Sequence, residues 1–372
     1  MFQLWRISDE MLKSLEREME KIYERAKKVA GRIEKKWKEI PEPIDCVACG
    51  VDGSRGIKEL SGVILYFVTS VSIGNEQREM SEVAVLRPHL NIEERVRLHM
   101  HTSEFRIGSL AEEELVLIDG SLRGAFVRPA SYVDDPEKLM ESYELENFVL
   151  DFLEILEKYF EVLSDDVRNE RAKKNYLLTR EEIFLEMEKS YRKGEKRLED
   201  LMILAEYIEY LHALNRLLDK KVIFLAKNFY TNEFDDEVSD AAILEILSLE
   251  QFGFEKAGYI SFKPQFRKTF PWFVREFRDE FKNLFRDINS AFVRFEDYGN
   301  IYLIESTEKI DEELISKLMS LEVNGYPFPL MQAHRIAKIK KIELQKLLIS
   351  IISSLKPEFA PLLRSGRDVL DV

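Results

Sequence analysis

Residues 49–68 read CGVDGSRGIKELSGVILYFV, and residues 115–127 read LVLIDGSLRGAFV. In each stretch an apolar, strand-like segment runs into Asp-Gly-Ser, at Asp52 and again at Asp119. Glycine lets a chain turn sharply and lets a ligand come close to the backbone. The repeated motif therefore predicts two carboxylates at the ends of two strands, where they can converge on one site.

The composition excludes several classes of protein. The chain has 372 residues, of which 45% are hydrophobic, which is enough for a large core in one or two domains and too many for a disordered chain. With 69 acidic and 55 basic residues the net charge is −14, which excludes a uniformly basic coat for nucleic acid. The N-terminus, MFQLWRISDEML, lacks a signal peptide's basic and apolar regions, and the apolar runs fall short of the ~20 residues of a membrane span. We therefore expect a soluble, cytoplasmic protein without a membrane partner.

Two regions are expected along the chain: an N-terminal helix within residues 1–40 and a main domain over residues 41–372. Ser8 can cap the helix, and the apolar residues that follow alternate at spacings of three and four. They form a narrow, heptad-like stripe of Leu12, Leu15, Met19, Ile22, Ala26, Val29 and Ile33. Such a stripe is typical of a helix that packs on one partner helix, so we expect residues 1–40 to serve in a dimer or a partner contact.

The main domain alternates strands and helices in an informative order. Three β-rich runs with short connections predict an antiparallel meander, after which strands and helices alternate. The predicted elements are strands at 44–51, 62–73 and 81–86, a helix at 92–107, a strand at 114–119, helices within about 137–219, a strand at 222–227 and a helix at 237–249. This is the order of the ribonuclease H-like fold, an α/β fold with a mixed sheet in which parallel strands extend three antiparallel strands.

Beyond residue 255 the sequence predicts a C-terminal extension. It contains a basic and aromatic segment, a strand pair at 290–295 and 300–306, a loop at 323–334 and a closing helix. In the basic segment phenylalanine recurs at every fourth position from 273 to 285, which predicts a stripe that faces the core. The alternate positions can follow a phosphate backbone or lie in solvent; they are Arg275, Arg278, Lys282 and Arg286.

The two Asp-Gly-Ser motifs predict a metal centre. Two carboxylates at short range resist joint ionisation, and a divalent cation removes that cost. Ligand sets made of oxygen atoms suit Mg²⁺ or Mn²⁺, and a pair of such ions about 3.5–4 Å apart supports in-line phosphoryl displacement. Asp52 and Asp119 are therefore the first two predicted ligands.

Two further ligands are expected from helices. Glu104, on the predicted helix between the two aspartates, is preferred to the glutamates at 112–114, which directly precede a strand and are expected to be solvated. Asp240 heads an amphipathic helix and is preferred to the acids at 235–237, which lie in a connection. The alternative is that Asp-Gly is ordinary turn chemistry and that the helical acids are caps.

Lys227 and His334 are the other catalytic candidates. Lys227 ends the apolar strand at the same predicted edge of the sheet, where it can hold a phosphate or simply extend its ammonium group into solvent. His334 can move a proton or orient the nucleophile, although a single histidine on a helix is often structural. The other histidines show no ligand spacing, since His99 and His101 lie two residues apart on a predicted helix and would face different directions.

The series of motifs resembles the NurA nucleases, archaeal and bacterial enzymes that act with the hexameric ATPase HerA in DNA end processing. The matching segments are VDGSR with ELSGVILYFVTSV, LVLIDGSL, VIFLAK, SDAAILEIL, the pair VRF and YLIE, and GYPFPLMQAH. Together they extend from about residue 45 to about residue 350, and their order and spacing are more specific than any one of them.

The resemblance implies a ribonuclease H-like core and Mn²⁺-dependent cleavage of DNA, with Mg²⁺ as the other cation to consider. The implied activities are 5′ to 3′ exonuclease and single-strand endonuclease on single-stranded DNA and duplex ends, in end resection and double-strand break repair. The implied partners are a second copy of the chain and a HerA-type ATPase.

The resemblance also implies roles for particular residues. Asp52 and Asp119 match the strand-end metal ligands, Glu104 the helical acid and Asp240 the later acidic motif. Lys227 matches the strand-end lysine and His334 the histidine of the last motif, and Arg55 of VDGSR is a further predicted DNA contact. The chain departs from the family after Lys227, where Asn228-Phe229 replaces an expected small hydroxyl residue.

Two other classes remain as alternatives. An ATPase of the actin and sugar-kinase type has strand-end aspartates, but those motifs usually separate Asp from Gly by one residue and come with a Gly-rich adenosine loop. Here Asp abuts Gly and no such loop occurs. A non-catalytic adaptor would use the N-terminal helix for assembly, but a scaffold has no need for the full set of acids.

Overall fold

The computed structural model describes residues 9–87, 91–126, 132, 136–169 and 176–363. The chain divides into two compact units, a larger one of residues 47–223, 267–287 and 328–372 and a smaller one of residues 1–46, 224–266 and 288–327. None of the helices in the described residues combines the length and the apolar character that crossing a membrane requires.

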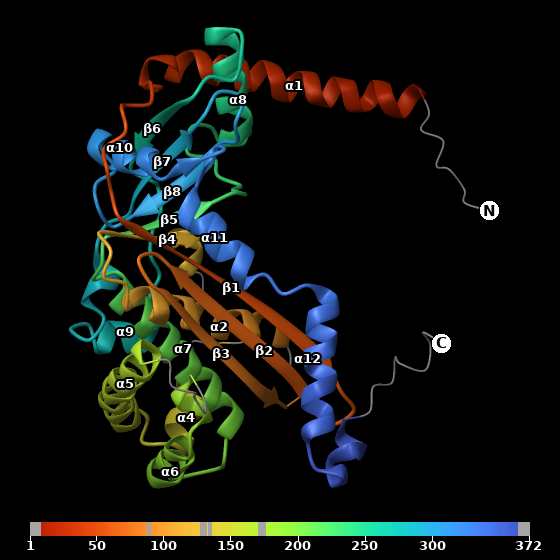
Figure 1. Cartoon of the computed structure of the whole chain (residues 1–372), viewed down its shortest axis with the longest axis vertical. Coiled ribbons are helices and arrows are strands. Elements are labelled where there is room, and N and C mark those ends of the chain that lie inside the picture. The colour runs from red at the N-terminus through yellow and green to blue at the C-terminus, as the bar shows by residue number, and fades with distance from the viewer. Residues whose placement is uncertain (1–8, 88–90, 127–131, 133–135, 170–175, 364–372) are drawn as a thin grey trace. The chain divides into compact units, whose positions relative to one another are not determined.

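A mixed sheet forms the centre of the larger unit (Figure 1). Its strands are β1 (Ala48–Glu59), β2 (Ile64–Ile73), β3 (Gln77–Leu86) and β4 (Leu115–Asp119), in the order β3-β2-β1-β4. The first three are antiparallel, as predicted, and β4 lies parallel to β1. β2 is a nearly continuous buried run because helices α2 (Ile92–Ser109) and α11 (Phe328–Ala337) both pack on it.

The other helices of the larger unit include the predicted helical insertion. They are α3 (Leu122–Ala125), α4 (Glu137–Ser142), α5 (Leu145–Arg168), η2 (Leu178–Arg180), α6 (Glu182–Tyr191), α7 (Leu198–Leu217), α9 (Trp272–Glu276), η3 (Lys282–Phe285), α12 (Lys341–Ser354) and η4 (Pro357–Leu362). The prediction of helices within 137–219 is therefore confirmed.

The smaller unit contains a set of antiparallel strands. Its strands follow the order β5-β8-β7-β6: β5 (Val222–Ala226, which begins in the larger unit), β8 (Tyr302–Ser306), β7 (Asn289–Arg294) and β6 (Gly258–Phe262). The remaining elements are α1 (Asp9–Ile33), η1 (Glu34–Lys36), α8 (Asp240–Phe252), α10 (Glu312–Ser320) and the hairpin β9 (Glu322–Val323) and β10 (Tyr326–Pro327). The predicted strand pair is confirmed as β7 and β8, whereas β6 was missed because five residues are too few to show a period.

The apolar stripe of α1 is buried only in its second half. Ala26, Val29 and Ile33 pack in one core cluster with α8, so α8 is the partner helix for this half. In the first half of the stripe, Leu15 and Met19 are 55% and 58% exposed. Ser8, the predicted cap, lies outside the described residues, and a dimer or partner role for residues 1–40, as a region separate from residues 41–372, stays a prediction.

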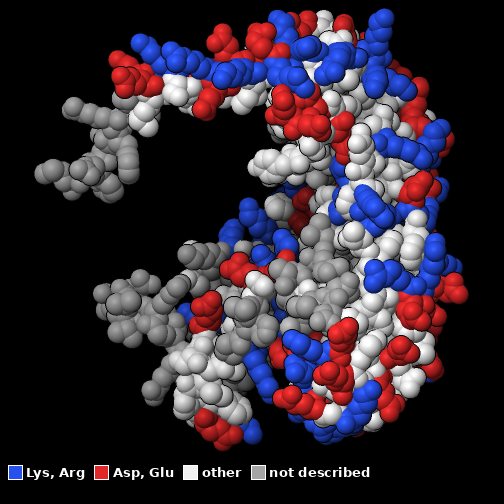
Figure 2. Space-filling view, turned by 180° about the vertical axis from the view of Figure 1, so that it is seen from behind, with Lys and Arg blue, Asp and Glu red and all other residues white. Residues whose placement is uncertain are grey.

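Basic and acidic side chains are interspersed over the described surface in the view of Figure 2. The face seen in that view does not carry charges of one sign only. This distribution agrees with the exclusion of a uniform basic coat, so any DNA contact must be local.

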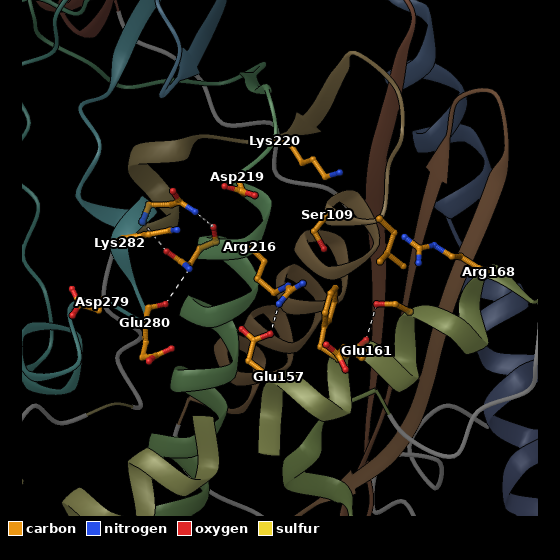
Figure 3. Close-up of a pocket in the computed structure, with 15 residues that line it drawn as sticks. Ser109, Glu157, Glu161, Arg168, Arg216, Asp219, Lys220, Asp279, Glu280 and Lys282 are labelled. Carbon is orange, nitrogen blue, oxygen red and sulfur yellow. Dashed lines mark hydrogen bonds and ion pairs between the residues drawn. The ribbon is translucent and has the colours of Figure 1, made fainter. Parts of the chain in front are cut away.

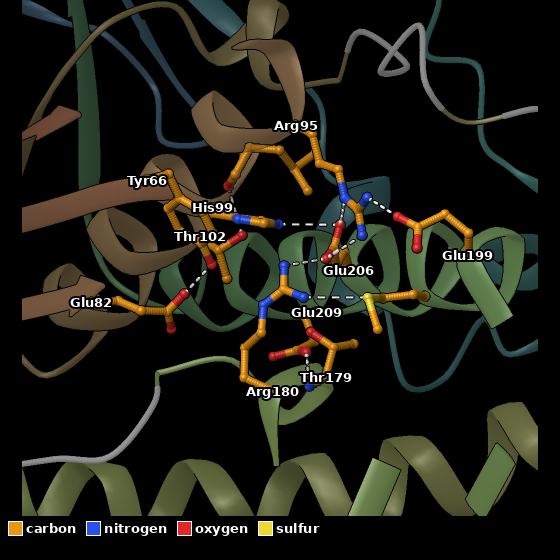
Figure 4. Close-up of polar contacts among 12 residues, drawn as sticks. Tyr66, Glu82, Arg95, His99, Thr102, Thr179, Arg180, Glu199, Glu206 and Glu209 are labelled. Atoms are coloured by element: carbon orange, nitrogen blue, oxygen red, sulfur yellow. Dashed lines mark hydrogen bonds and ion pairs between the residues drawn. The ribbon is translucent and has the colours of Figure 1, made fainter. Parts of the chain in front are cut away.

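A buried network of charges fixes α2 to α7 (Figure 4). The Arg95 guanidinium lies 2.6 Å from Glu206 and also pairs with Glu199. His99 Nε2 lies 3.1 Å from Glu206, and Arg180 of η2 lies 2.7 Å from the same carboxylate. Because Arg95 and His99 are one turn apart on α2, they face α7 together.

One turn further along α7, a second carboxylate continues the network. Glu209 accepts hydrogen bonds from Arg106 of α2 at 2.7 Å and from the Leu178 and Thr179 N–H groups at 3.0 and 2.9 Å. Glu209 and Arg106 are fully buried. The network therefore sets the position of α2 along α7 through charge pairs that have no access to water.

The pKa of Glu206 shows how the network is balanced. Burial by itself would raise this pKa, but His99, Arg95 and Arg180 together hold it well below its ordinary value. A carboxyl whose folded-state pKa is depressed stabilises the fold above its unfolded pKa, and that contribution is lost as the pH falls through the folded-state pKa. Acid should therefore weaken the attachment of α2 to α7.

We expect Glu206→Gln to lower the free energy of unfolding by about 3–5 kcal/mol, because it leaves Arg95 and Arg180 buried without their counter-charge. Urea denaturation followed by circular dichroism measures the change. The matched control is Glu154→Gln on α5, which breaks an exposed ion pair with Lys158 and should leave the urea midpoint nearly unchanged. Equal midpoints for the two variants would contradict the importance of the network.

Candidate metal centre

The register between β1 and β4 brings the two predicted aspartates together. Val51 pairs with Ile118 in the parallel ladder, so the next residues, Asp52 and Asp119, lie side by side. The predicted convergence of the two Asp-Gly-Ser motifs is confirmed. The two motifs differ, however, in what their glycines do.

The second motif ends its strand and the first does not. Gly120 has φ +138°, which favours glycine, and the Ser121 hydroxyl caps α3 by accepting from the Gly124 N–H at 3.1 Å. The predicted strand end after Val51 is wrong, because β1 continues to Glu59 in unbroken pairing with β2.

Gly53 instead makes room for a helix side chain. A Cβ at this position would lie 2.6 Å from Glu104 Oε1, so only glycine lets the α2 carboxylate come so close to β1. Gly50 does the same for α11, since a Cβ there would lie 2.3 Å from the Pro329 carbonyl carbon. Residues 50 and 53 point to opposite faces of the strand, so α2 and α11 approach β1 from opposite sides.

His334 reaches the aspartates from α11. The predicted loop at 323–334 is wrong from Phe328 onward, where a helix begins: Pro329 is tolerated in its first turn, and Leu330, Ala333 and Ala337 are buried at helical spacing. His334 Nδ1 lies 2.7 Å from Asp52 Oδ2.

Asp52, Asp119 and His334 form the group that fits a metal ion among the described residues. One donor atom from each lies within 4.8 Å of the others. Burial raises the pKa of Asp52 and the charge of Asp119 raises it further, while His334 lowers it. A cation held by these three side chains would offset the repulsion that raises this pKa, and carboxylate oxygens suit Mn²⁺ or Mg²⁺.

Glu104 lies beside this group but outside it. The side chain is 2% exposed, and burial raises its pKa most, with smaller contributions from the charges of Asp52 and Asp119. The glutamates at 112–114 precede β4 and so lie at the other end of that strand from Asp119. Glu104 is the helical acid nearest the centre, and its role as a ligand stays a prediction.

His101 is a site residue that the sequence analysis missed. Its Nδ1 lies 2.6 Å from Glu104 Oε2 and lowers the pKa of that buried carboxyl. The His101 ring stacks on Phe105 with centroids 6.1 Å apart and an interplanar angle of 18°. The spacing of three residues between His101 and Glu104 was the available signal, because such positions are neighbours on a helix.

Asp240 has a different environment, in the smaller unit. Its carboxylate is completely buried and accepts hydrogen bonds from the Glu233 and Phe234 N–H groups at 2.8 and 3.0 Å. These contacts fix the connection between β5 and α8. They account for the burial of Asp240 without a metal ion, and its role as a ligand stays a prediction.

The predicted DNA contacts are spread over both units. Lys227 follows β5 in the smaller unit, with Nζ 4.9 Å from the centre of the Tyr326 ring. In the larger unit Arg55 of β1 donates to the Glu93 carbonyl oxygen at the start of α2. Both side chains therefore have partners within the chain, and their contacts with DNA stay predictions.

The basic-aromatic segment is not one helix. Phe273 and Phe281 are fully buried, as predicted, but α9 ends at Glu276 and η3 starts at Lys282, so the segment has no continuous basic face. Arg278 lies 4.3 Å over the Phe285 ring, and Arg286 donates to the Leu218 carbonyl oxygen at 2.7 Å. Arg275, Arg278 and Lys282 remain exposed to solvent.

Lys282 lines a groove of about 610 Å³ in the larger unit (Figure 3). Charges of both signs line this groove. Glu157 pairs with Arg216 and lies 2.7 Å from His212 Nε2, and Asp279 and Glu280 stand on the same wall as Lys282. This mixture does not favour a phosphate backbone, so the groove adds no support to a DNA contact by Lys282.

Comparisons with known proteins identify a family that the chain resembles over most of its length. The model of the NurA domain matches residues 46–339. An uncharacterized protein of Methanocaldococcus jannaschii is 31% identical and covers 90% of each chain. A DNA double-strand break repair nuclease NurA of Pyrococcus furiosus is 26% identical, over 90% of this chain and 92% of the relative.

A solved structure of NurA bound to dAMP and manganese has the same fold. It superposes with a TM-score of 0.79 at 25% identity, covering 95% of this chain and 98% of that one. The family model and the M. jannaschii relative each cover most of the chain, and the chain therefore belongs to the NurA family.

Proposed function

We propose that this chain is a manganese-dependent DNA nuclease that acts in double-strand break repair. The observation that supports the proposal is the convergence of Asp52, Asp119 and His334, whose donor atoms lie close enough together to hold a cation, in a member of the NurA family. The P. furiosus relative is named a repair nuclease, and the solved structure of NurA holds manganese with a nucleotide.

The side chains have separate tasks in this proposal. Asp52 and Asp119 hold the cation, which when bound activates water and stabilises the leaving oxygen of a phosphodiester. His334 orients the Asp52 carboxylate through the 2.7 Å contact and, being 48% exposed at its side chain, can pass a proton to solvent. Glu104, held by His101, supplies a further carboxylate from the α2 side.

The finer features of the proposal follow the family resemblance. A ribonuclease H-like arrangement and a second metal ion would use Glu104 and Asp240 as further ligands and Lys227 as a phosphate contact. Mg²⁺ is the alternative cation, since it prefers the same oxygen ligands.

The expected substrates are single-stranded DNA and duplex ends, cut as a 5′ to 3′ exonuclease and a single-strand endonuclease. We propose a HerA-type ATPase as the partner, a homodimer as the assembly and the cytoplasm as the location. The exposed first half of the α1 stripe, with Leu15 at 55% exposure, supports an assembly role for this helix.

Asp52→Asn and Asp119→Asn should each reduce metal-dependent cleavage of end-labelled DNA at least about 100-fold, because each removes a charge that holds the cation. The assay compares Mn²⁺, Mg²⁺ and EDTA on single-stranded and duplex substrates. Asp219→Asn, an exposed change in the groove of Figure 3, is the matched control and should cleave normally. An inactive wild type under every metal, with and without a HerA-type ATPase, would favour the adaptor.

Binding of Mn²⁺ should weaken as the pH falls. The raised pKa values of Asp52 and Glu104 mean that protons compete with the cation at a higher pH than they would at ordinary carboxyls, so binding at such pH values releases protons. Calorimetry in two buffers with different ionisation enthalpies measures this release. Glu104→Gln should reduce it, and an affinity that does not change with pH would contradict the assignment.

The contact between His101 and Glu104 should matter for metal affinity. His101→Ala should weaken Mn²⁺ binding about tenfold, since a ligand loses the hydrogen bond that orients it. His101→Asn keeps a donor near the position of Nδ1 and should restore most of the affinity. Electron paramagnetic resonance of free Mn²⁺ gives both values. If both variants bind Mn²⁺ with the affinity of the wild type, His101 does not belong to the site.

A further inference from the structure

A groove opens beside Lys227 and the three residues that follow it. The groove lies in the smaller unit, has a volume of about 380 Å³, and is lined by Lys227, Asn228, Phe229, Tyr230, Ala241, Glu245, Asn300, Ile301 and Tyr302. Its volume falls within the range of small-ligand sites.

Tyr230 is the most unusual residue of the groove. It is 98% exposed, the largest exposure among the large apolar and aromatic side chains that the structure describes. Buried tyrosine gains from packing, whereas an aromatic ring held in water costs free energy unless a ligand covers it. The ring therefore has the character of a contact surface.

The loop that carries Tyr230 is anchored on both sides of the ring. Phe229 packs against the core cluster of the smaller unit, with its ring 5.1 Å from that of Phe292. After Tyr230, the Thr231 carbonyl oxygen accepts a hydrogen bond from the Asp240 N–H at 2.9 Å. Anchors one residue away on each side hold the backbone of Tyr230 in place, so the ring is attached to a fixed part of the loop and is open to a ligand.

The charges of the groove suit an anionic ligand with a polar edge. Glu245 is its acid, and this carboxylate is paired with the fully buried Arg294. Lys227 supplies a cation, and the exposed Asn228 and Asn300 supply amide donors and acceptors. One nucleotide has a part for each of these groups: a base that can stack on the tyrosine, a phosphate that can lie near the lysine, and a base edge that can bind the asparagines.

We propose that this groove binds one nucleotide of single-stranded DNA, with its base on Tyr230 and its phosphate at Lys227. The proposal rests on the proposed nuclease function and adds a strand-holding contact to it. Stacking of this kind tolerates any base, because every base has a flat aromatic face. The subsite therefore holds the strand without selecting its sequence.

The test measures binding of a single-stranded oligonucleotide that contains 2-aminopurine, with the full chain in EDTA so that no cleavage occurs. Stacking of the base on Tyr230 should quench its fluorescence. Tyr230→Ala should lose the quench and weaken binding about tenfold, whereas Tyr230→Phe should keep both. Tyr298→Ala, at a tyrosine that is 70% exposed and does not line the groove, is the matched control and should behave as wild type.

Lys227→Gln gives an independent measurement. Losing one phosphate contact on a single strand should reduce the slope of log affinity against log salt by about 0.7. If Tyr230→Ala binds and quenches as wild type does, the nucleotide assignment is wrong. If it binds DNA normally but no longer associates with a HerA-type ATPase, the surface is a protein contact instead. A wild type that neither binds nor cleaves DNA would overturn the proposed function as well.

Discussion

The repulsion between Asp52 and Asp119 is the constraint around which the larger unit is built. The parallel register of β1 and β4 fixes it, because Val51 faces Ile118 and the next pair is two carboxylates. A slip of one residue would turn Asp52 to the other face of the sheet and separate the pair. The fold buries Asp52 and keeps it next to Asp119, and burial first and the charge of Asp119 second raise the pKa of Asp52. Proteins commonly keep such unfavourable contacts, which lower the free energy of unfolding, at sites that bind a ligand or catalyse a reaction.

Two glycines allow helices on both faces of the sheet to come close to β1. Gly53 admits the Glu104 carboxylate from α2, and Gly50 admits the backbone of α11, which carries His334. The close packing on the α2 side also needs the helix to be fixed along its axis. The buried pairs of α2 with Glu206 and Glu209 do this from the far side of the helix. A charge network remote from the aspartates thus controls where Glu104 stands.

The features that the sequence predicted are local ones. A strand followed by Asp-Gly is visible within a few residues, so Asp52 and Asp119 and the first five strands were found. The continuation of β1 past Gly53 was not predicted, because a glycine within a strand and a glycine in a turn have the same local sequence pattern. Only the structure shows that Gly53 makes room for Glu104. The charge network of α2 joins residues that are far apart in the chain, such as Arg95 and Glu206, which are separated by 111 positions. A periodic pattern within one helix cannot predict such a pair. His101 could have been found, since its spacing from Glu104 is a helical one.

A net charge of −14 limits how such a chain can hold DNA. Binding that relied on many phosphate contacts would have to overcome the repulsion of a chain with this net charge, and on the face that Figure 2 shows the basic side chains are interspersed with acidic ones. Two kinds of contact avoid that difficulty. A bound cation reverses the sign of the field at Asp52 and Asp119, and stacking on an aromatic ring such as Tyr230 depends little on the protein's charge. If the chain is the nuclease proposed above, its acidic surface therefore favours holding a strand by the bases, with the phosphates attracted where a metal ion or a single lysine can receive them.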